Sequence, residues 1–276
     1  MKKNADLHVH THFSDGTDTP QEVMARAREK GLSCIAIADH DTVDGIGEAV
    51  KLQDEYSVEV IPAVEITAQE GEKELHILAY FIDWQSQTLK ARLKQICDGR
   101  IERIFKIAEK LRERGINANA EDIIKFATGK AVSRLHVAKY LVEKGLVPSM
   151  KTAFDKYIGD GKPCYVSRFK FSLKEIADII KRAGGIAVIA HPGLDSVSSI
   201  LPSLVKNGIE GIEVYHSDHT PNITDKLKQF AQDNNLLVTG GSDCHGLNKR
   251  ELLMGKIKLP YSYVEKMKDY VKKRIV

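Results

Sequence analysis

The chain has 276 residues, of which 42% are hydrophobic and 29% are charged, and its formal net charge is +3. This length suits one large α/β domain, or one such domain with an insertion. No apolar run reaches the roughly 18 residues that a membrane-spanning helix needs, and the polar N-terminus is unlike a signal peptide. The four scattered cysteines favour free thiols in a reducing cytoplasm over a disulfide framework or a zinc ribbon.

Positive charge is concentrated in residues 83–165, which hold 17 Lys and Arg against 10 Asp and Glu. The net charge of this segment is therefore +7, and that of the rest of the chain is −4. An acidic body with a basic insert fits a carboxylate-lined metal site facing a lid that attracts anions. A solvated helix face with incidental charge explains the same numbers equally well.

The first predicted element is a buried strand that begins at about residue 5. Its His8 and His10 alternate with Leu7 and Val9, so the two imidazoles should lie side by side on one face of the strand. Two imidazoles held this way on a rigid strand can bind one metal ion, and Asp15 follows them closely.

Helices and strands then alternate along the N-terminal third. They are predicted at 19–30 (helix, capped by Thr19 with Glu22), 34–38 (strand, followed by Asp39 and His40), 44–56 (helix), 58–66 (strand, with Glu65 at its far end) and 75–82 (strand, with His76 near its beginning).

From residue 84 to about 158, apolar residues recur only at helical spacing, which predicts an all-helical insertion of about 75 residues. The alternating pattern then resumes. Helices are predicted at 172–183, 198–207, 222–234 and 261–274, and strands at 186–190, 211–215 and 236–239.

Seven predicted strands, separated mostly by helices, favour a βα barrel or a doubly wound sheet. Most of the polar clusters follow directly after a strand, where βα architectures collect their active sites. Eight of the ten histidines lie in or beside these strand ends, so we expect a single site there.

Four motifs make the sequence resemble the PHP (polymerase and histidinol phosphatase) family of metal-dependent phosphoesterases. They are Asp6-Leu-His-Val-His-Thr with Ser14-Asp-Gly, Ala38-Asp-His-Asp-Thr, His191-Pro, and Gly241-Ser-Asp-Cys-His. The resemblance implies an α/β fold with a distorted seven-stranded βα barrel formed by 1–82 and 166–276. Residues 83–165 are then a helical lid inserted into the barrel domain.

The resemblance also implies two or three divalent metal ions. The first would be held by His8, His10, Glu65 and Asp243, the second by Glu65, His76 and His191, and the third by Asp15, His40 and His245. Imidazoles mixed with carboxylates suit Mn²⁺, which we expect here, but also Fe²⁺ or Zn²⁺. Glu65, Asp243 and His191 are the expected catalytic residues, acting around a water that the metals activate. Asp6 and Asp39 would either orient the ligand histidines or cap strand ends.

The insertion resembles that of PHP phosphatases acting on nucleoside 3′,5′-bisphosphates and short oligonucleotides. Its Ser133 and Arg134 begin a predicted helix, where an anion is favoured. Substrate contacts are expected from Ser133, Arg134, His136, Lys162 and His216.

We therefore predict a cytoplasmic phosphoesterase for small nucleotides, and for short single-stranded RNA, with neither a membrane nor an obligate protein partner. Histidinol-phosphate phosphatase and a non-catalytic metal-binding PHP module are the alternatives. The first shares the metal motifs, and the second would not need all nine ligand candidates.

Overall fold

The computed structural model describes residues 2–71, 73–127, 131–167, 169–193, 201–248 and 252–275. It contains two compact units. The first, called here the barrel unit, is Met1–Leu93 with Phe171–Val276, and the second, the helical unit, is Lys94–Lys170. The division falls inside one long helix, α4 (Gln87–Arg112), whereas the sequence analysis placed the boundaries at 82/83 and 165/166.

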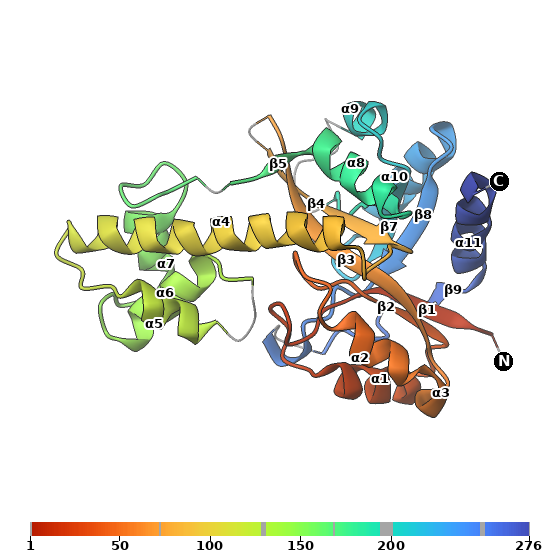
Figure 1. The fold of residues 1–276 in the computed structure, drawn as a ribbon, viewed down its shortest axis with the longest axis horizontal. Helices are drawn as coiled ribbons and strands as arrows, with labels where there is room; N and C mark the ends of the chain where they lie inside the picture. Colours follow the sequence, from red (N-terminus) through yellow and green to blue (C-terminus); the bar gives the residue numbers. More distant parts are fainter. Residues whose placement is uncertain are drawn as a thin grey trace. The chain divides into compact units, whose positions relative to one another are not determined.

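A mixed sheet curls through the barrel unit (Figure 1). Its strands are β1 (Asn4–Val9), β2 (Cys34–Ile37), β3 (Glu59–Glu70), β4 (Lys73–Tyr80), β5 (Phe171–Ser172), β6 (Ile186–Ile189), β7 (Gly211–His216), β8 (Leu237–Gly241) and β9 (Leu259–Pro260). They are ordered β8-β7-β6-β4-β3-β2-β1-β9, and β5 pairs with β3. β4 is antiparallel to both of its neighbours and β9 is antiparallel to β1, whereas the remaining pairs are parallel.

The segment after β8 joins β1 and closes the barrel. The backbone N–H of His10 donates to the carbonyl of Cys244 at 2.9 Å, and Val9 and Cys244 form a parallel bridge. β9 pairs only with Asn4 and Ala5, and so leaves this part of β1 available. The predicted βα barrel is therefore confirmed, and the doubly wound alternative is excluded. In the described part of the chain its sheet has nine strands rather than the expected seven, because the two-residue strands β5 and β9 were not predicted.

Gly241 permits this closure because a side chain would not fit beside β1. A Cβ atom at Gly241 would lie 2.3 Å from His8 Cβ and 2.4 Å from the His8 backbone nitrogen. Since backbone cannot move aside cheaply, we expect Gly241→Ala to lower the free energy of unfolding by about 3 kcal/mol or more.

Urea unfolding measures this loss, and Gly31→Ala is the control. Gly31 has a φ of +70°, but a Cβ atom there would meet no other atom within 4 Å, so its substitution should cost only about 1–2 kcal/mol of backbone strain. Equal losses in the two variants would contradict the close approach at Gly241.

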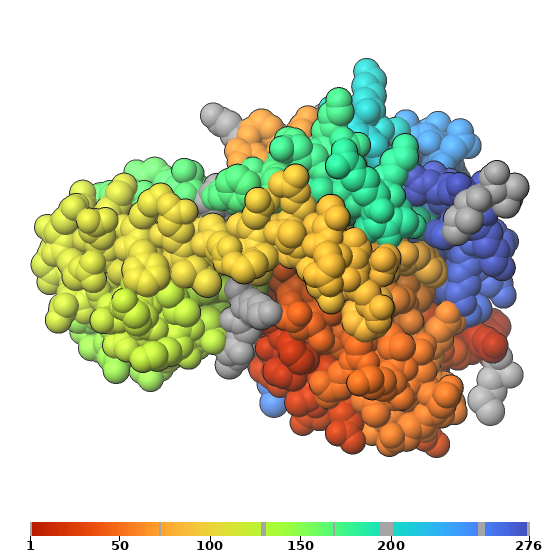
Figure 2. Space-filling view, viewed as in Figure 1, coloured from red at the N-terminus to blue at the C-terminus, as the bar shows by residue number. Residues whose placement is uncertain are grey.

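Helices surround the strands of the barrel unit. They are α1 (Pro20–Glu29), α2 (Ile46–Lys51), α3 (Gln53–Tyr56), α8 (Leu173–Arg182), α9 (Leu201–Lys206), α10 (Pro221–Asp233) and α11 (Ser262–Ile275). In the space-filling view, the red to orange segment that carries α1, α2 and α3 forms one side of the barrel unit (Figure 2). The predicted cap of the first helix is confirmed, because Thr19 and Glu22 form a capping box. No described helix is both long and apolar enough to cross a membrane.

The helical unit has a hydrophobic core of its own. Besides most of α4, it contains α5 (Ala120–Phe126), α6 (Arg134–Glu143), α7 (Met150–Ala153) and the π-helical turn η1 (Phe154–Ile158). Ile104, Ile107 and Leu111 of α4 are fully buried in this core. The returning chain is held along α4, because Arg103 Nε donates to the carbonyl of Val166 at 2.7 Å.

Three predicted elements differ from the structure. The strand expected to end at residue 66 continues to Glu70, so that Glu65 lies inside β3. The helix expected over 44–56 is two helices, α2 and α3, joined at Leu52. The first three residues of the helix expected over 198–207 lie outside the described part of the chain, and the described part is α9.

Candidate metal centre

Glu65 is surrounded by five imidazoles, divided between its two carboxylate oxygens. Oε1 lies 3.0 Å from His76 Nδ1 and 2.9 Å from His191 Nε2. Three imidazoles face Oε2: His40 Nδ1 at 3.0 Å, His10 Nε2 at 3.3 Å and His8 Nε2 at 3.4 Å. The side chain of Glu65 is only 1% exposed, so the carboxylate depends on these neighbours for its stabilisation.

Strand register explains why distant residues meet at Glu65. β3 and β4 pair Thr67 with His76 and Glu65 with Leu78, so that Glu65 and His76 are diagonal neighbours on one face. His40 follows β2 and forms an isolated parallel bridge with Glu65. His191 follows β6 in the left-handed region, with a φ of 30°.

Nine potential ligands gather at this end of the barrel, in overlapping groups. Three groups bring their ligand atoms within 4.8 Å of one another: His8, His10, Glu65 and Asp243; His40, Glu65 and His76; and His10, Asp15, His40 and His245. The first group is the one implied for the first metal. The other two also contain most of the residues implied for the second and third metals, and His191 reaches Glu65 directly.

Asp243 and Asp15 supply the remaining carboxylates. Asp243 Oδ1 lies 3.4 Å from His8 Nε2 and 3.1 Å from His10 Nε2. Asp15 Oδ1 lies 3.3 Å from Nε2 of His245. The other ring nitrogen of His245, Nδ1, donates to the carbonyl of Asp243 at 2.9 Å. In a neutral ring this hydrogen bond keeps the proton of His245 on Nδ1 and leaves the Nε2 lone pair available to a metal ion.

The imidazoles and carboxylates shift one another's pKa values. Burial alone would raise the pKa of Glu65, but the surrounding histidines hold it well below its ordinary value. Burial alone would lower the pKa of His76, yet the neighbouring Glu65 raises it to about 9. The pKa of His10 falls to about 4, because burial and nearby His245 both disfavour its charged form.

Several buried polar atoms at the centre have no hydrogen-bond partner among the described residues. They are His8 Nε2, both ring nitrogens of His10, and Glu65 Oε2. Buried polar atoms are rarely left in this state in stable proteins. One nitrogen of each neutral imidazole and the carboxylate oxygen have a lone pair that can bind a cation. The residues therefore fit a bound divalent cation, and they belong to types that such ions prefer.

We expect metal binding to release protons, because His76 holds one in the metal-free protein at neutral pH. With a folded pKa of about 9 against 6.5 for the unfolded chain, this proton stabilises the metal-free fold fully below pH 6.5. That stabilisation is lost as the pH rises through 9. Calorimetric titration of the chelated protein with Mn²⁺ at pH 7.5, in two buffers of different ionisation enthalpy, should show about one or more protons released.

In the same titration, proton release should decrease when the pH is raised above 9. His76→Gln is the matching variant, since it should lose this pH dependence. Binding without proton release at pH 7.5 would contradict the ligand role of His76.

Asp6 and Asp39 stabilise loops rather than ligand rings. Asp39 accepts from the backbone N–H of Thr11 at 2.7 Å and from the hydroxyl of Ser14 at 2.6 Å. Asp6 accepts from the backbone N–H of Ser242 at 2.8 Å, and burial raises its pKa to about 6. Of the two roles considered for these residues, the structure favours the capping of strand ends and loops.

Glu213 is a site residue that the sequence analysis did not identify. It lies in β7, is fully buried, and contacts His8 Nδ1 at 3.0 Å. The only signal in the sequence is one acidic residue inside the apolar strand Gly211–His216.

His216 lies beside the same centre, with Nε2 3.6 Å from Asp243 Oδ2. Its Nδ1 accepts from the backbone N–H of Asp218 at 3.2 Å, so a neutral ring carries its proton on Nε2. His216 can therefore donate a hydrogen bond toward Asp243 or toward a substrate oxygen.

The other predicted substrate contacts belong to the helical unit. Ser133 caps α6, and its backbone N–H donates to His136 Nδ1 at 3.1 Å, so both residues have a structural role at this helix end. Arg134 Nη1 donates to the Asp160 carboxylate at 3.0 Å and to the Ile158 carbonyl at 3.3 Å. Lys162 is exposed.

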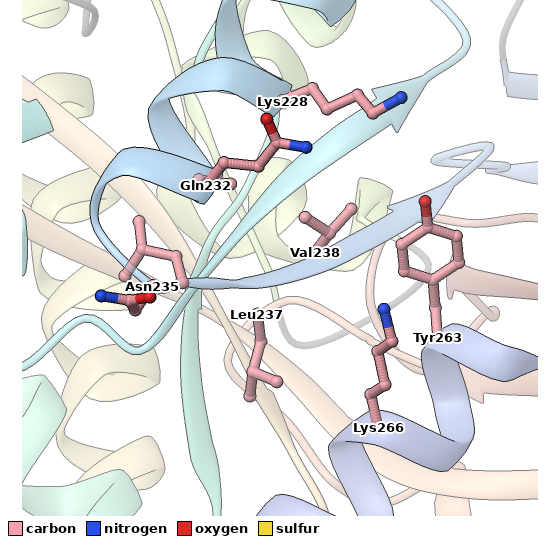
Figure 3. Close-up of a pocket in the computed structure, with 9 residues that line it drawn as sticks. Lys228, Gln232, Asn235, Leu237, Val238, Tyr263 and Lys266 are labelled. Atoms are coloured by element: carbon pink, nitrogen blue, oxygen red, sulfur yellow. The ribbon is translucent and has the colours of Figure 1, made fainter.

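A surface pocket of about 450 Å³ lies elsewhere, between α10, β8 and α11 (Figure 3). Its lining includes Leu237 and Val238, the first residues of β8, together with Lys228, Tyr263 and Lys266. None of the nine potential ligands is among the residues that line this pocket.

Known proteins that are similar to this chain include a phosphatase and an exoribonuclease. The sequence profile of the PHP domain matches residues 6–186. A 3′,5′-nucleoside bisphosphate phosphatase from Chromobacterium violaceum is 35% identical over 88% of this chain and 87% of its own. The 5′-3′ exoribonuclease Rnm of Escherichia coli is 34% identical over 87% of this chain and 84% of its own.

A solved structure shows the same fold throughout the chain. A proposed metal-dependent phosphoesterase from Bifidobacterium adolescentis superimposes with a TM-score of 0.82 and 29% identity. The match covers 96% of this chain and 95% of the other. The fold and the cluster of histidines and carboxylates define a metal-dependent hydrolase, and the chain belongs to the PHP family. The predicted family and hydrolase class are thus confirmed.

Proposed function

We propose that the protein hydrolyses phosphate esters of small nucleotides, with nucleoside 3′,5′-bisphosphates and short oligoribonucleotides as its substrates. The observation that carries the proposal is the division of Glu65 between two sets of imidazoles, with His76 and His191 at Oε1 and three others at Oε2. A carboxylate placed in this way can bridge two ions, which is the arrangement used for two-metal phosphoryl transfer.

The chain's own residues would hold and orient the reacting groups. The first metal position would be held by His8, His10 and Asp243, the second by His76 and His191, and the third by Asp15, His40 and His245, with Glu65 shared by the first two. Bound divalent ions supply Lewis acidity, which lowers the pKa of water and offsets charge on the phosphoryl oxygens. The Nε2–H of a neutral His216, near Asp243, would donate to an oxygen of the substrate.

Two or three ions are expected, with Mn²⁺ favoured over Fe²⁺ and Zn²⁺. Imidazole and carboxylate ligands do not select sharply among these metals, so availability decides. All four cysteines are buried thiols, which fits a reducing cytoplasm.

Nucleotides are favoured as substrates because of the relatives' names and the helical unit. The bacterial relatives are a bisphosphate phosphatase and an exoribonuclease, and both match over most of their length. Arg134 lies at the first turn of α6, and its guanidinium would bind the second phosphate of such a substrate. Histidinol phosphate has no second phosphate, so this contact would have no purpose in a histidinol-phosphate phosphatase.

A phosphate-release assay tests the proposal. The protein is stripped by chelation, reloaded with Mn²⁺, and given a nucleoside 3′,5′-bisphosphate, a mononucleotide, a short oligoribonucleotide and histidinol phosphate. We expect release from the bisphosphate and the oligonucleotide to exceed that from the other two. Fastest release from histidinol phosphate would favour the alternative enzyme, and no release from any substrate would favour a non-catalytic module.

A further inference from the structure

Glu213 is a fully buried carboxylate whose two partners are His8, in β1, and His191, just after β6. Its Oε1 and Oε2 lie 3.0 and 3.3 Å from His8 Nδ1, and Oε2 also accepts from the backbone N–H of His191 at 2.8 Å. A buried carboxylate without such partners would cost several kcal/mol in stability. The two partners are candidate ligands of two different metal positions.

At His8, Glu213 determines which ring nitrogen faces the centre. A ring that donates from Nδ1 to a carboxylate keeps its Nε2 lone pair available when it is neutral. His8 Nε2 lies 3.4 Å from both Glu65 Oε2 and Asp243 Oδ1, and it has no hydrogen-bond partner among the described residues. In the neutral ring that a metal ion requires, the proton of His8 is thus kept on Nδ1, away from the metal position.

At His191, the same carboxylate acts on the backbone. A residue other than glycine at a φ of 30° is strained, and the surrounding structure must hold it there. The hydrogen bond from His191 N–H to Glu213 fixes the backbone where Nε2 lies 2.9 Å from Glu65 Oε1.

We propose that Glu213 is a positioning residue that aligns His8 and His191 for two neighbouring metal ions. The Glu213 carboxylate thereby connects His8, which faces Glu65 Oε2, with His191, which faces Glu65 Oε1. The proposal rests on the metal centre inferred above, but it concerns a residue outside that centre's set of ligands.

The test measures Mn²⁺ binding to the whole protein, by equilibrium dialysis with metal analysis and by electron paramagnetic resonance. Glu213→Gln keeps the size of the side chain and removes its charge. We expect Mn²⁺ affinity to fall by roughly 10- to 100-fold and the signal of a spin-coupled Mn²⁺ pair to disappear. The thermal midpoint of the metal-free protein is measured alongside.

Glu210→Gln is the matched control. It removes the charge of a carboxylate one residue before β7, where Glu210 accepts from the N–H of Ala187 and the hydroxyl of Tyr270, away from both histidines. It should leave Mn²⁺ affinity unchanged. A Glu213→Gln protein that is less stable but binds the Mn²⁺ pair as wild type does would overturn the proposal, since Glu213 would then be structural only.

Glu213→Asp covers the case in which Glu213→Gln does not fold. It keeps the charge on a shorter side chain that cannot reach both partners, so the spin-coupled pair should again weaken, and wild-type binding would overturn the proposal. If the wild-type protein itself binds no Mn²⁺ pair, the metal centre fails together with this inference. If the wild-type protein binds the Mn²⁺ pair and the Glu213 variant does not, the positioning role of Glu213 is supported. If both proteins bind the pair equally well, that role is refuted but the metal centre is not.

Discussion

Glu65→Gln should reduce the rate of phosphate release by about a thousandfold while the protein remains folded. The substitution keeps the size of the side chain but removes its negative charge and replaces one oxygen with an –NH2 group, whose nitrogen cannot bind a cation. Since Oε1 and Oε2 face different sets of imidazoles, the loss affects two metal positions together. A thousandfold decrease corresponds to about 4 kcal/mol of transition-state stabilisation, which is within the range that metal ions supply.

Steady-state kinetics at saturating Mn²⁺ provides the measurement, and circular dichroism confirms the fold. Glu70→Gln is a suitable control because it makes the same chemical change at the end of the same strand. Glu70 accepts from Asn207 Nδ2 at 3.2 Å and contacts none of the site histidines. Turnover near the wild-type rate in Glu65→Gln would show that Glu65 does not bridge metal ions.

Most of the candidate centre could be predicted because its residues are marked locally in the sequence. His40, His191 and Asp243 each follow an apolar strand within a few residues. In a barrel of mostly parallel strands, such ends converge at one rim. The positions of the strand ends therefore predict that these three side chains lie at one rim. Glu65 and His76 lie inside their strands, and their place in the ligand set was implied by the resemblance to the PHP family.

Glu213 could not be predicted in the same way, because its surroundings depend on barrel closure. It lies between Ile212 and Val214, and a lone carboxylate in an apolar strand can face either the solvent or the interior. Only the meeting of β1 with the end of β8 brings His8 close to this strand. No property of residues 211–216 alone reveals that contact.

The sequence analysis predicted that β3 ends at residue 66 rather than at Glu70, for a related reason. Its last residues, Thr67 to Glu70, are mostly polar and have no strand periodicity of their own. They are extended because they pair with β4 across the Gly71 turn, up to the pair Glu70 and Lys73. Tertiary pairing outweighs local preference in such a segment.

Arg134→Ala should raise the KM for a nucleoside 3′,5′-bisphosphate more than it lowers kcat. We propose that the guanidinium binds the phosphate that is not being cleaved, so its contribution is uniform binding rather than transition-state stabilisation. The expected loss in kcat/KM corresponds to roughly 2–4 kcal/mol for an unpaired, partly buried phosphate. The loss should be much smaller for a mononucleotide, because it has no second phosphate.

The contacts of Arg134 within the helical unit provide a control that separates substrate binding from structure. Asp160 accepts from its Nη1, and the guanidinium carbon lies 6.0 Å from the ring centroid of Phe154 and 5.2 Å from that of Tyr165. The Asp160 side chain is 77% exposed, so Asp160→Ala frees the guanidinium at little cost to the fold. If Arg134 binds phosphate, this variant should keep or lower the KM for the bisphosphate.

Steady-state kinetics on the two substrates distinguishes the remaining roles of Arg134. Equal losses on the bisphosphate and the mononucleotide would mean that Arg134 contacts the reacting phosphate. A similar rise in KM in Arg134→Ala and Asp160→Ala, together with lower thermal stability in both, would mean that the ion pair only braces the helical unit. If Arg134→Ala lowers kcat/KM on neither substrate, Arg134 does not contact the second phosphate. The main structural reason for preferring a nucleotide over histidinol phosphate would then be lost.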